Sequence, residues 1–202
     1  MPVHASLGEL FPQGIRRGAT VSVTSTSLML LLLAASTQAG SWVAIMGQPH
    51  IGVVAARELG VRLERCAFVP YYSAHSAAKV IAALIDAVDF VVLHGVEGVQ
   101  GGDARRLIAR ARERKCTLVL NRTTFPGVTP LTLTVTSLSW RMAANGAGRL
   151  QGRWMEVTAS GRGPMARPLR SSVWLGDAEN TAIPARSVPV TPMTSTRRKV
   201  VS

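Results

Sequence analysis

Residues 76–120 read SAAKVIAALIDAVDFVVLHGVEGVQGGDARRLIARARERKCTLVL, and this stretch decides the fold. It contains two apolar runs, at 89–93 and 117–120, and each follows a segment with helical character. Strands that are apolar on both faces and separated by helices are typical of a parallel sheet with crossover helices. The stretch therefore predicts a helix over 76–87 and another over 103–115, the second with Asp103 as its N-cap.

The same alternation continues toward the N-terminus. Apolar runs at 19–23, 41–46 and 66–69 predict three further strands, and the segments 27–39 and 51–59 predict two helices. The most apolar run, 28–35, is eight residues long, whereas a membrane span needs about twenty. We interpret this run as a buried core helix. The N-terminus shows no signal-peptide pattern, so we expect a cytoplasmic protein without membrane contact.

The pattern changes after Pro130. Residues 131–138 alternate Thr or Ser with apolar residues, and 153–160 and 171–175 are two more β-like segments. They predict an antiparallel extension of the sheet, with Gly146 and Gly148 in a turn. Residues 177–202 have no periodicity, so we expect a flexible basic tail that is disordered when alone. The predicted organisation is one α/β domain over 1–176, followed by this tail.

The chain is strongly basic, with 23 Lys and Arg against 11 Asp and Glu and a net charge of +12. Residues 149–202 hold nine basic and three acidic residues and so carry half of that net charge. Such a balance favours an anionic partner or an acidic protein surface. Cys66 and Cys116 are interpreted as two reduced thiols of a cytosolic protein, and no spacing of His and Cys predicts a metal site.

Four segments resemble the ATPase core of RecA-type recombinases. They are Gly14–Gly18 before the first strand, Ala56–Val61 at the end of a helix, Val88–Leu93, and Leu118–Asn121. The similarity covers about residues 8–160 and lies mostly in the order and spacing of these segments. It implies a RecA-like fold, in which a mainly parallel, twisted sheet is flanked by helices.

More narrowly, the chain resembles the actinobacterial ImuA-type proteins, RecA-like accessory factors of the damage-inducible mutagenic polymerase system. The similarity rests on the opening Leu7–Pro12, on a short loop after the first strand and on the Gly- and Arg-rich segment Gly148–Gly163. It implies a role in DNA damage tolerance with an ImuB-type Y-family polymerase homologue as partner. It also implies an error-prone polymerase III alpha-type subunit or RecA as a further partner, and nucleoid association in the complex.

Three positions that ATP hydrolysis needs in a RecA-type protein hold unsuitable residues. A P-loop uses glycines and a Lys to hold phosphates, but the first strand is followed by Thr24, Ser25, Thr26 and Ser27. Either these hydroxyls bind a stray phosphate or sulfate at a helix N-terminus, or Thr26 or Ser27 simply caps the helix. Gln48 stands in place of the catalytic Glu, and His94 replaces the Asp that organises Mg²⁺. We therefore expect neither a nucleotide cofactor nor catalysis.

Arginines form the candidate contact surfaces. Arg106, Arg110 and Arg114 share one face of the predicted helix, which is either a DNA-binding site or a solvated outer face. Arg122 lies where recombinases place a DNA-contacting loop: either it is a further candidate DNA contact, with Phe125 as a stacking ring, or the loop is a turn with Phe125 buried. The C-terminal region combines Arg with Trp, which is typical of protein interfaces. Its candidate partner-binding residues are Arg149, Arg153, Trp154, Arg162, Arg167, Arg170 and Trp174.

Two functions from different classes follow from these features. One is an adaptor without catalytic activity, whose RecA-like core is a rigid platform for protein partners. The alternative is a single-stranded DNA-binding module of a repair complex. Salt dependence distinguishes the two, because phosphate binding weakens log-linearly with salt concentration. A weak ATPase with an unrecognised site is a third hypothesis.

Overall fold

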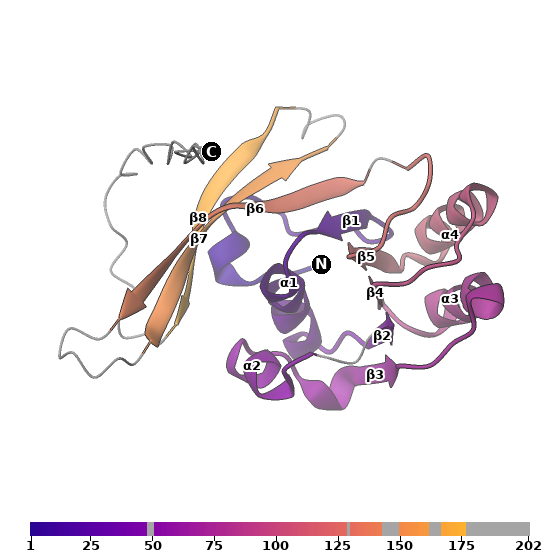
Figure 1. Cartoon of the computed structure of the whole chain (residues 1–202), viewed down its shortest axis with the longest axis horizontal. Helices are drawn as coiled ribbons and strands as arrows, with labels where there is room; N and C mark the ends of the chain where they lie inside the picture. The colour runs from indigo at the N-terminus through magenta and orange to yellow at the C-terminus, as the bar shows by residue number, and fades with distance from the viewer. Residues whose placement is uncertain (48–50, 129, 143–149, 162–166, 177–202) are drawn as a thin grey trace, which may run out of the picture.

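The computed structural model describes residues 1–47, 51–128, 130–142, 150–161 and 167–176. Its strands form one sheet in the order β3-β2-β4-β5-β1-β6-β7-β8 (Figure 1). Strands β1 to β6 pair in parallel, whereas β7 and β8 are added antiparallel. The strands are β1 (Thr20–Val23), β2 (Val43–Gly47), β3 (Cys66–Val69), β4 (Phe90–His94), β5 (Thr117–Asn121), β6 (Leu131–Met142), β7 (Leu150–Ser160) and β8 (Leu169–Gly176).

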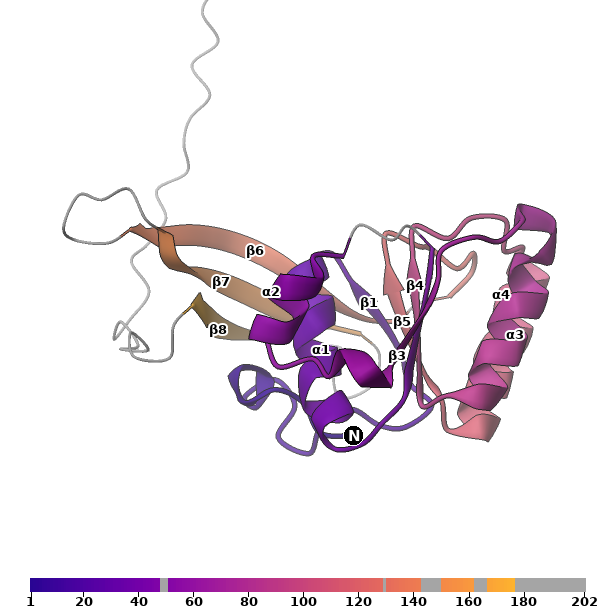
Figure 2. The same ribbon diagram turned by 90° about the horizontal axis from the view of Figure 1, so that it is seen from below.

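Helices cover both faces of the sheet, which confirms the predicted fold class. Two of them, α1 and α2, lie on one face, and α3 and α4 lie on the other (Figures 1 and 2). Short 3-10 turns precede β1 and flank β3. The helices are α1 (Thr26–Gln38), α2 (Val53–Glu58), α3 (Ala77–Ala87) and α4 (Gly101–Arg114).

Helix α1 is the centre of the larger hydrophobic core. Its residues from Leu28 to Ala34 are all buried, as the apolar run predicted. They pack against the sheet, against Leu7 and Leu10 near the N-terminus, and against the inner face of β7 and β8. A helix that is apolar on every side must be enclosed. In the part of the chain that the structure describes, no helix has the length and apolarity needed to cross a membrane.

The second core lies on the opposite face and is built by amphipathic helices. Ile81 and Ile85 of α3, with Leu107 and Ala111 of α4, contact the side chains of β4 and β5. These helices are apolar on one side only, because their other side faces solvent. This core therefore fixes α4 over β5.

A bulge shapes the antiparallel part, which we call the C-terminal extension (β6–β8). Between Val135 and Ser137 the pairing of β6 with β7 shifts by one residue. Before the bulge Leu133 and Val135 face α1, and after it Leu138 occupies the same face, opposite the buried Met155. Because of the extra residue, odd-numbered residues of β6 point toward α1 before the bulge, and even-numbered residues do so after it. The bulge therefore accounts for the interrupted alternation in the sequence.

Two details of the predicted elements are wrong. Asp103 does not cap α4, because the helix already begins at Gly101 and Gln100 is its N-cap. The N-cap of α1 is Ser25, not Thr26 or Ser27. Gly146, Gly148 and the predicted tail over 177–202 lie outside the described residues.

Candidate functional site

The residues that the sequence analysis compared with a RecA-type nucleotide site follow or end the parallel strands. They therefore lie at one edge of the sheet, the carboxyl edge. Gly47 ends β2 opposite His94 of β4, and His94 lies opposite Asn121 of β5. Asn121 in turn lies opposite Val23, the last residue of β1. This edge is where open α/β sheets bind ligands. Gln48 follows Gly47 but lies outside the described residues.

The connection from β1 to α1 is too short to form a phosphate cradle. Only Thr24 and Ser25 separate the strand from the helix. The Ser25 hydroxyl accepts a hydrogen bond from the Ser27 backbone N–H (3.3 Å), and the Thr24 hydroxyl accepts one from the Val135 N–H (3.3 Å). Both hydroxyls are therefore engaged within the protein, as cap and strand contact, rather than turned toward a ligand.

An arginine from the C-terminal extension reaches the N-terminus of α1. The Arg153 guanidinium donates a hydrogen bond to the Ser27 hydroxyl and lies over the Trp140 ring, 5.2 Å from its centroid. A helix N-terminus carries positive partial charge and has unpaired N–H groups, so anions are the groups that it normally attracts. Here the protein places a cation, the Arg153 guanidinium, beside it.

His94 and Asn121 leave two buried polar atoms without a hydrogen-bond partner among the described residues. They are Nδ1 of His94, which is 6% exposed, and Oδ1 of Asn121. The amide nitrogen of Asn121 donates to the Val23 carbonyl oxygen (3.2 Å). Within the described residues, no group of three or more His, Cys, Asp or Glu side chains is placed to hold a metal ion. A carboxylate cage for Mg²⁺ is thus not present in that part of the chain.

The two cysteines do not contribute a reactive thiol to this edge. Both are free, and Cys116 is buried. Burial raises the pKa of the Cys116 thiol to about 12, and burial together with the nearby Glu64 raises that of Cys66 to about 11. Both thiols are therefore protonated at neutral pH, which is the unreactive form.

Two tryptophans and an arginine pack against one another on the face of the C-terminal extension that is turned away from α1. The rings of Trp154 and Trp174 are 5.1 Å apart with a tilt of 47°, and Arg141 lies over Trp174 at 5.4 Å. The Trp174 ring lies across Gly152, where an added Cβ would be 2.4 Å from a ring carbon. Trp174 is only 7% exposed. These side chains therefore hold the strands of the extension to one another.

On the opposite face of the extension, apolar side chains are exposed. Trp140 is 54% exposed and Leu138 is 46% exposed, and both lie two residues apart on β6. They share the side of the sheet that faces α1 and flank Arg153, which lies opposite Trp140 on β7. Sequence reasoning named Arg153 but missed Trp140 and Leu138. The bulge displaces them from the alternation that begins at Leu131.

The remaining predicted partner-binding residues are scattered. Arg170 is on the outer strand β8, opposite Thr158 of β7, and Arg167 precedes β8. Both arginines are exposed. Arg149 and Arg162 lie outside the described residues. The structure therefore brings together Arg153, Trp154 and Trp174 within one sheet, with Arg153 on one face and the two tryptophans on the other.

The arginine face of α4 is largely neutralised. Arg110 and Arg114 both donate to the Asp86 carboxylate of α3, the second at 3.1 Å, and Arg106 lies 3.8 Å from Asp103. The hydrogen bond from Arg110 holds the pKa of Asp86 below its ordinary value. Arg122 is exposed directly after β5 and has a left-handed backbone. The prediction of a DNA-binding face at Arg106, Arg110 and Arg114 did not include these carboxylates.

Comparison with known proteins places this geometry in a family. Residues 9–127 match the family model described as the MT3502 N-terminal domain. The chain is 38% identical over 167 residues to the uncharacterized protein Rv3395c of Mycobacterium tuberculosis (strain ATCC 25618 / H37Rv). That alignment covers 77% of this chain and 81% of the relative. The family model ends just before β6, so it contains the parallel strands β1–β5 and excludes the C-terminal extension.

Proposed function

The chain belongs to the family of the MT3502 N-terminal domain, and we propose that it is a non-catalytic RecA-like adaptor of ImuA type in SOS-induced mutagenesis and translesion synthesis. In this proposal it binds an ImuB-type Y-family polymerase homologue through the C-terminal extension. It acts in the cytoplasm and associates with the nucleoid as part of that complex. The observation that carries the proposal is the exposed pair Trp140 and Leu138 beside Arg153.

The carboxyl edge supports a role other than ATP hydrolysis. The hydroxyls of Thr24, Ser25 and Ser27 are all hydrogen-bonded to protein groups. His94 supplies an imidazole where the reaction needs a carboxylate for Mg²⁺. In the proposal, a rigid α/β core without these groups serves to position surfaces for partners.

The exposed face of β6 has the composition of an interface anchor. Tryptophan and arginine are enriched among residues that dominate binding energy, and such residues act from patches that a partner can desolvate. Trp140 is held in place by the Arg153 guanidinium, so little rotamer freedom remains to be lost on binding. Leu138 adds apolar area on the same side of the strand.

A matched pair of tryptophans tests the proposal. Trp140→Ala should weaken binding of the full chain to a purified ImuB-type homologue by about 30-fold, corresponding to a hot spot of about 2 kcal/mol. Trp42→Ala is the control, because Trp42 is 46% exposed and also lies under an arginine, Arg65, at 5.1 Å. It precedes β2, on the other side of the sheet order from β6. Calorimetric titration measures both affinities.

The outcomes separate three situations. If Trp42→Ala weakens binding as much as Trp140→Ala, the effect is not specific to the extension. If neither variant changes the affinity but charge reversal at Arg167 and Arg170 abolishes it, the interface lies on the outer edge of β8. If the unaltered chain does not bind the homologue at all, the proposed adaptor role is wrong.

A further inference from the structure

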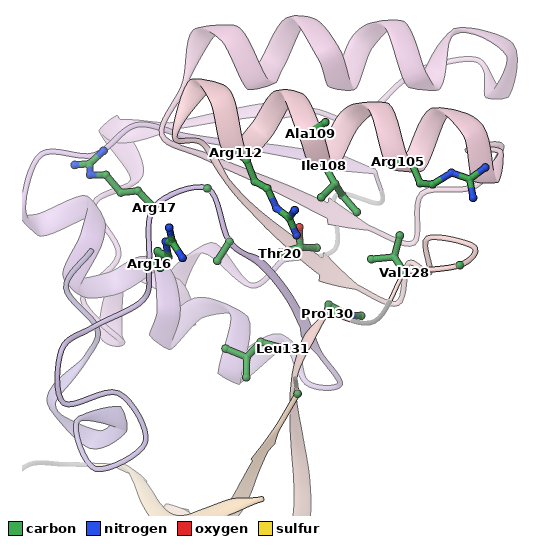
Figure 3. Close-up of a pocket in the computed structure, with 14 residues that line it drawn as sticks. Arg16, Arg17, Thr20, Arg105, Ile108, Ala109, Arg112, Val128, Pro130 and Leu131 are labelled. Carbon is green, nitrogen blue, oxygen red and sulfur yellow. The ribbon is translucent and has the colours of Figure 1, made fainter. Parts of the chain in front are cut away.

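A broad cleft lies beside α4, away from the carboxyl edge of the sheet. Helices α3 and α4 cover β2, β4 and β5 on this face, but the described residues between Asn121 and Pro130 form no helix that would cover β1 and β6. The resulting cleft has a volume of about 920 Å³. Its walls come from the start of β1, from α4, from the segment before β6 and from the end of β7 (Figure 3).

Among the described residues, those that line the cleft include four arginines and no Asp or Glu. They are Arg16 and Arg17 before β1, and Arg105 and Arg112 on α4. Arg17 pairs with Asp89 at 3.0 Å, whereas Arg16, Arg105 and Arg112 form no ion pair with the described residues. Figure 3 shows the Arg112 side chain extending from α4 toward Thr20. Concentrated positive charge without compensation raises the local potential and attracts an anion.

Helix α4 therefore has two arginine faces of different character. Arg106, Arg110 and Arg114 have the carboxylates of Asp103 and Asp86 beside them. Arg105 and Arg112, seven residues apart, line the cleft and have no ion-pair partner among the described residues. Seven residues of helix span roughly 10.5 Å. Cations at successive positions along a wall suit a chain of negative charges better than one small anion.

The remaining lining suits a sugar-phosphate chain. The hydroxyl of Thr20 is buried without a hydrogen-bond partner among the described residues, and a buried hydroxyl normally has one. Gly127 and Gly161 place accessible backbone in the wall, and hydroxyl and backbone groups are common partners of phosphate oxygens. Val128 and Leu131 add apolar surface for sugars or bases.

We propose that this cleft binds the phosphate backbone of single-stranded nucleic acid. The guanidinium groups of Arg16, Arg105 and Arg112 pair with successive phosphates, because a guanidinium matches phosphate geometry with two parallel hydrogen bonds. A single strand enters between the helix wall and the sheet wall, whereas a duplex presents a broad convex surface. This inference is independent of the adaptor role, since Trp140 and Leu138 do not line the cleft.

Two double variants of the same helix test the proposal. Fluorescence anisotropy of a labelled oligothymidylate with the full chain, over a salt series, gives the affinity and its salt slope. Arg105→Gln with Arg112→Gln should lower the affinity by about tenfold or more and reduce the slope by about 1.4, which is 0.7 for each lost phosphate contact. Arg106→Gln with Arg114→Gln removes the same charge from the same helix and should leave the slope unchanged.

A third variant comes from the opposite wall. Arg16→Gln should reduce the slope by about 0.7, and because Arg16 precedes β1, its effect does not depend on the integrity of α4. The arginines concerned are exposed, and thermal melting checks that each variant is folded. The proposal is overturned if the unaltered chain does not bind the oligonucleotide, or if the two double variants lose affinity equally. It is also overturned if a polyglutamate peptide displaces the oligonucleotide at equal charge concentration, because the cleft would then be a site for an acidic protein.

Discussion

The parallel half of the sheet (β1–β5) and the C-terminal extension use apolar residues in different ways. In the parallel half, the side chains of β2, β4 and β5 are buried on both faces, between α1 on one side and α3 with α4 on the other. In the extension, Met155, Val173 and Leu175 on the inner face of β7 and β8 are buried in the core around α1. On the same face, Leu138 and Trp140 of β6 are about half exposed. Burial thus accounts for the apolar residues of β2, β4 and β5, and it does not account for Leu138 and Trp140 of the extension.

This difference separates stability from recognition. An apolar side chain that is enclosed on every side contributes to folding, and its removal leaves a cavity. A half-exposed apolar residue contributes little to folding and is available to a partner. The family model covers the parallel half and ends before β6, so the region that the family model matches is the scaffold rather than the exposed patch.

The largest expected effect is in the core of the parallel half. Leu31→Ala removes a side chain of α1 that has no exposed surface, and we expect it to lower the free energy of unfolding by about 2–5 kcal/mol. Leu138→Ala, the same change in the extension, should cost less than about 1 kcal/mol because Leu138 is half exposed. Equilibrium unfolding in urea measures both. Equal losses would show that Leu138 is structural and would remove the contrast.

The next effect concerns the carboxyl edge of the parallel half, where β2 and β4 end side by side. Gly47 has φ of +114°, and a Cβ there would lie 2.0 Å from the His94 carbonyl oxygen. We expect Gly47→Ala to cost more than about 2 kcal/mol, because it adds a backbone clash to conformational strain. Gly40→Ala is the control: Gly40 has φ of +92° with open space around it, and its strain alone should cost about 1 kcal/mol. The same urea titration compares them, and equal losses would mean that β2 and β4 move apart freely.

The sequence predicts the parallel half well because its signal is local. The central residues of β2, β4 and β5 (43–46, 90–93 and 118–120) are all apolar, and a buried parallel strand is the structure that requires this. The cap of α1 was missed for an equally local reason. All four residues from Thr24 to Ser27 carry a hydroxyl, so residue type cannot select Ser25 among them.

Tertiary pairing explains what the sequence did not reveal in the site. Spacing on α4 identified Arg106, Arg110 and Arg114 as one face, but their partner Asp86 is on another helix. Spacing equally could not show that Arg105 and Arg112 would meet Arg16 across a cleft. The exposed position of Trp140 depends on a bulge four residues earlier, and a bulge has no firm signature in residue type.

The smallest expected effect tests whether ion pairs on α4 stabilise the parallel half. Asp86 accepts hydrogen bonds from Arg110 and Arg114, and the Arg110 hydrogen bond depresses the pKa of Asp86 in the folded state. A depressed pKa means that folding favours the ionised form. The contribution is therefore complete above the unfolded pKa of about 3.9 and is lost as the pH falls through the lower folded pKa. Asp86→Asn removes the contribution at every pH.

The expected result is a small stability difference between the unaltered chain and Asp86→Asn. The difference in free energy of unfolding should be constant between about pH 5 and pH 8 and should disappear on acidification below about pH 4. It should also decrease with added salt, because Asp86 and its arginine partners are accessible to solvent. Arg105→Gln is the comparison on the cleft face, and since Arg105 has no ion-pair partner among the described residues, it should leave stability unchanged over the same pH range. Urea titrations at each pH measure both variants. If Arg105→Gln destabilised the chain as much as Asp86→Asn, the cleft arginines would serve the fold, and a ligand would not be needed to explain them.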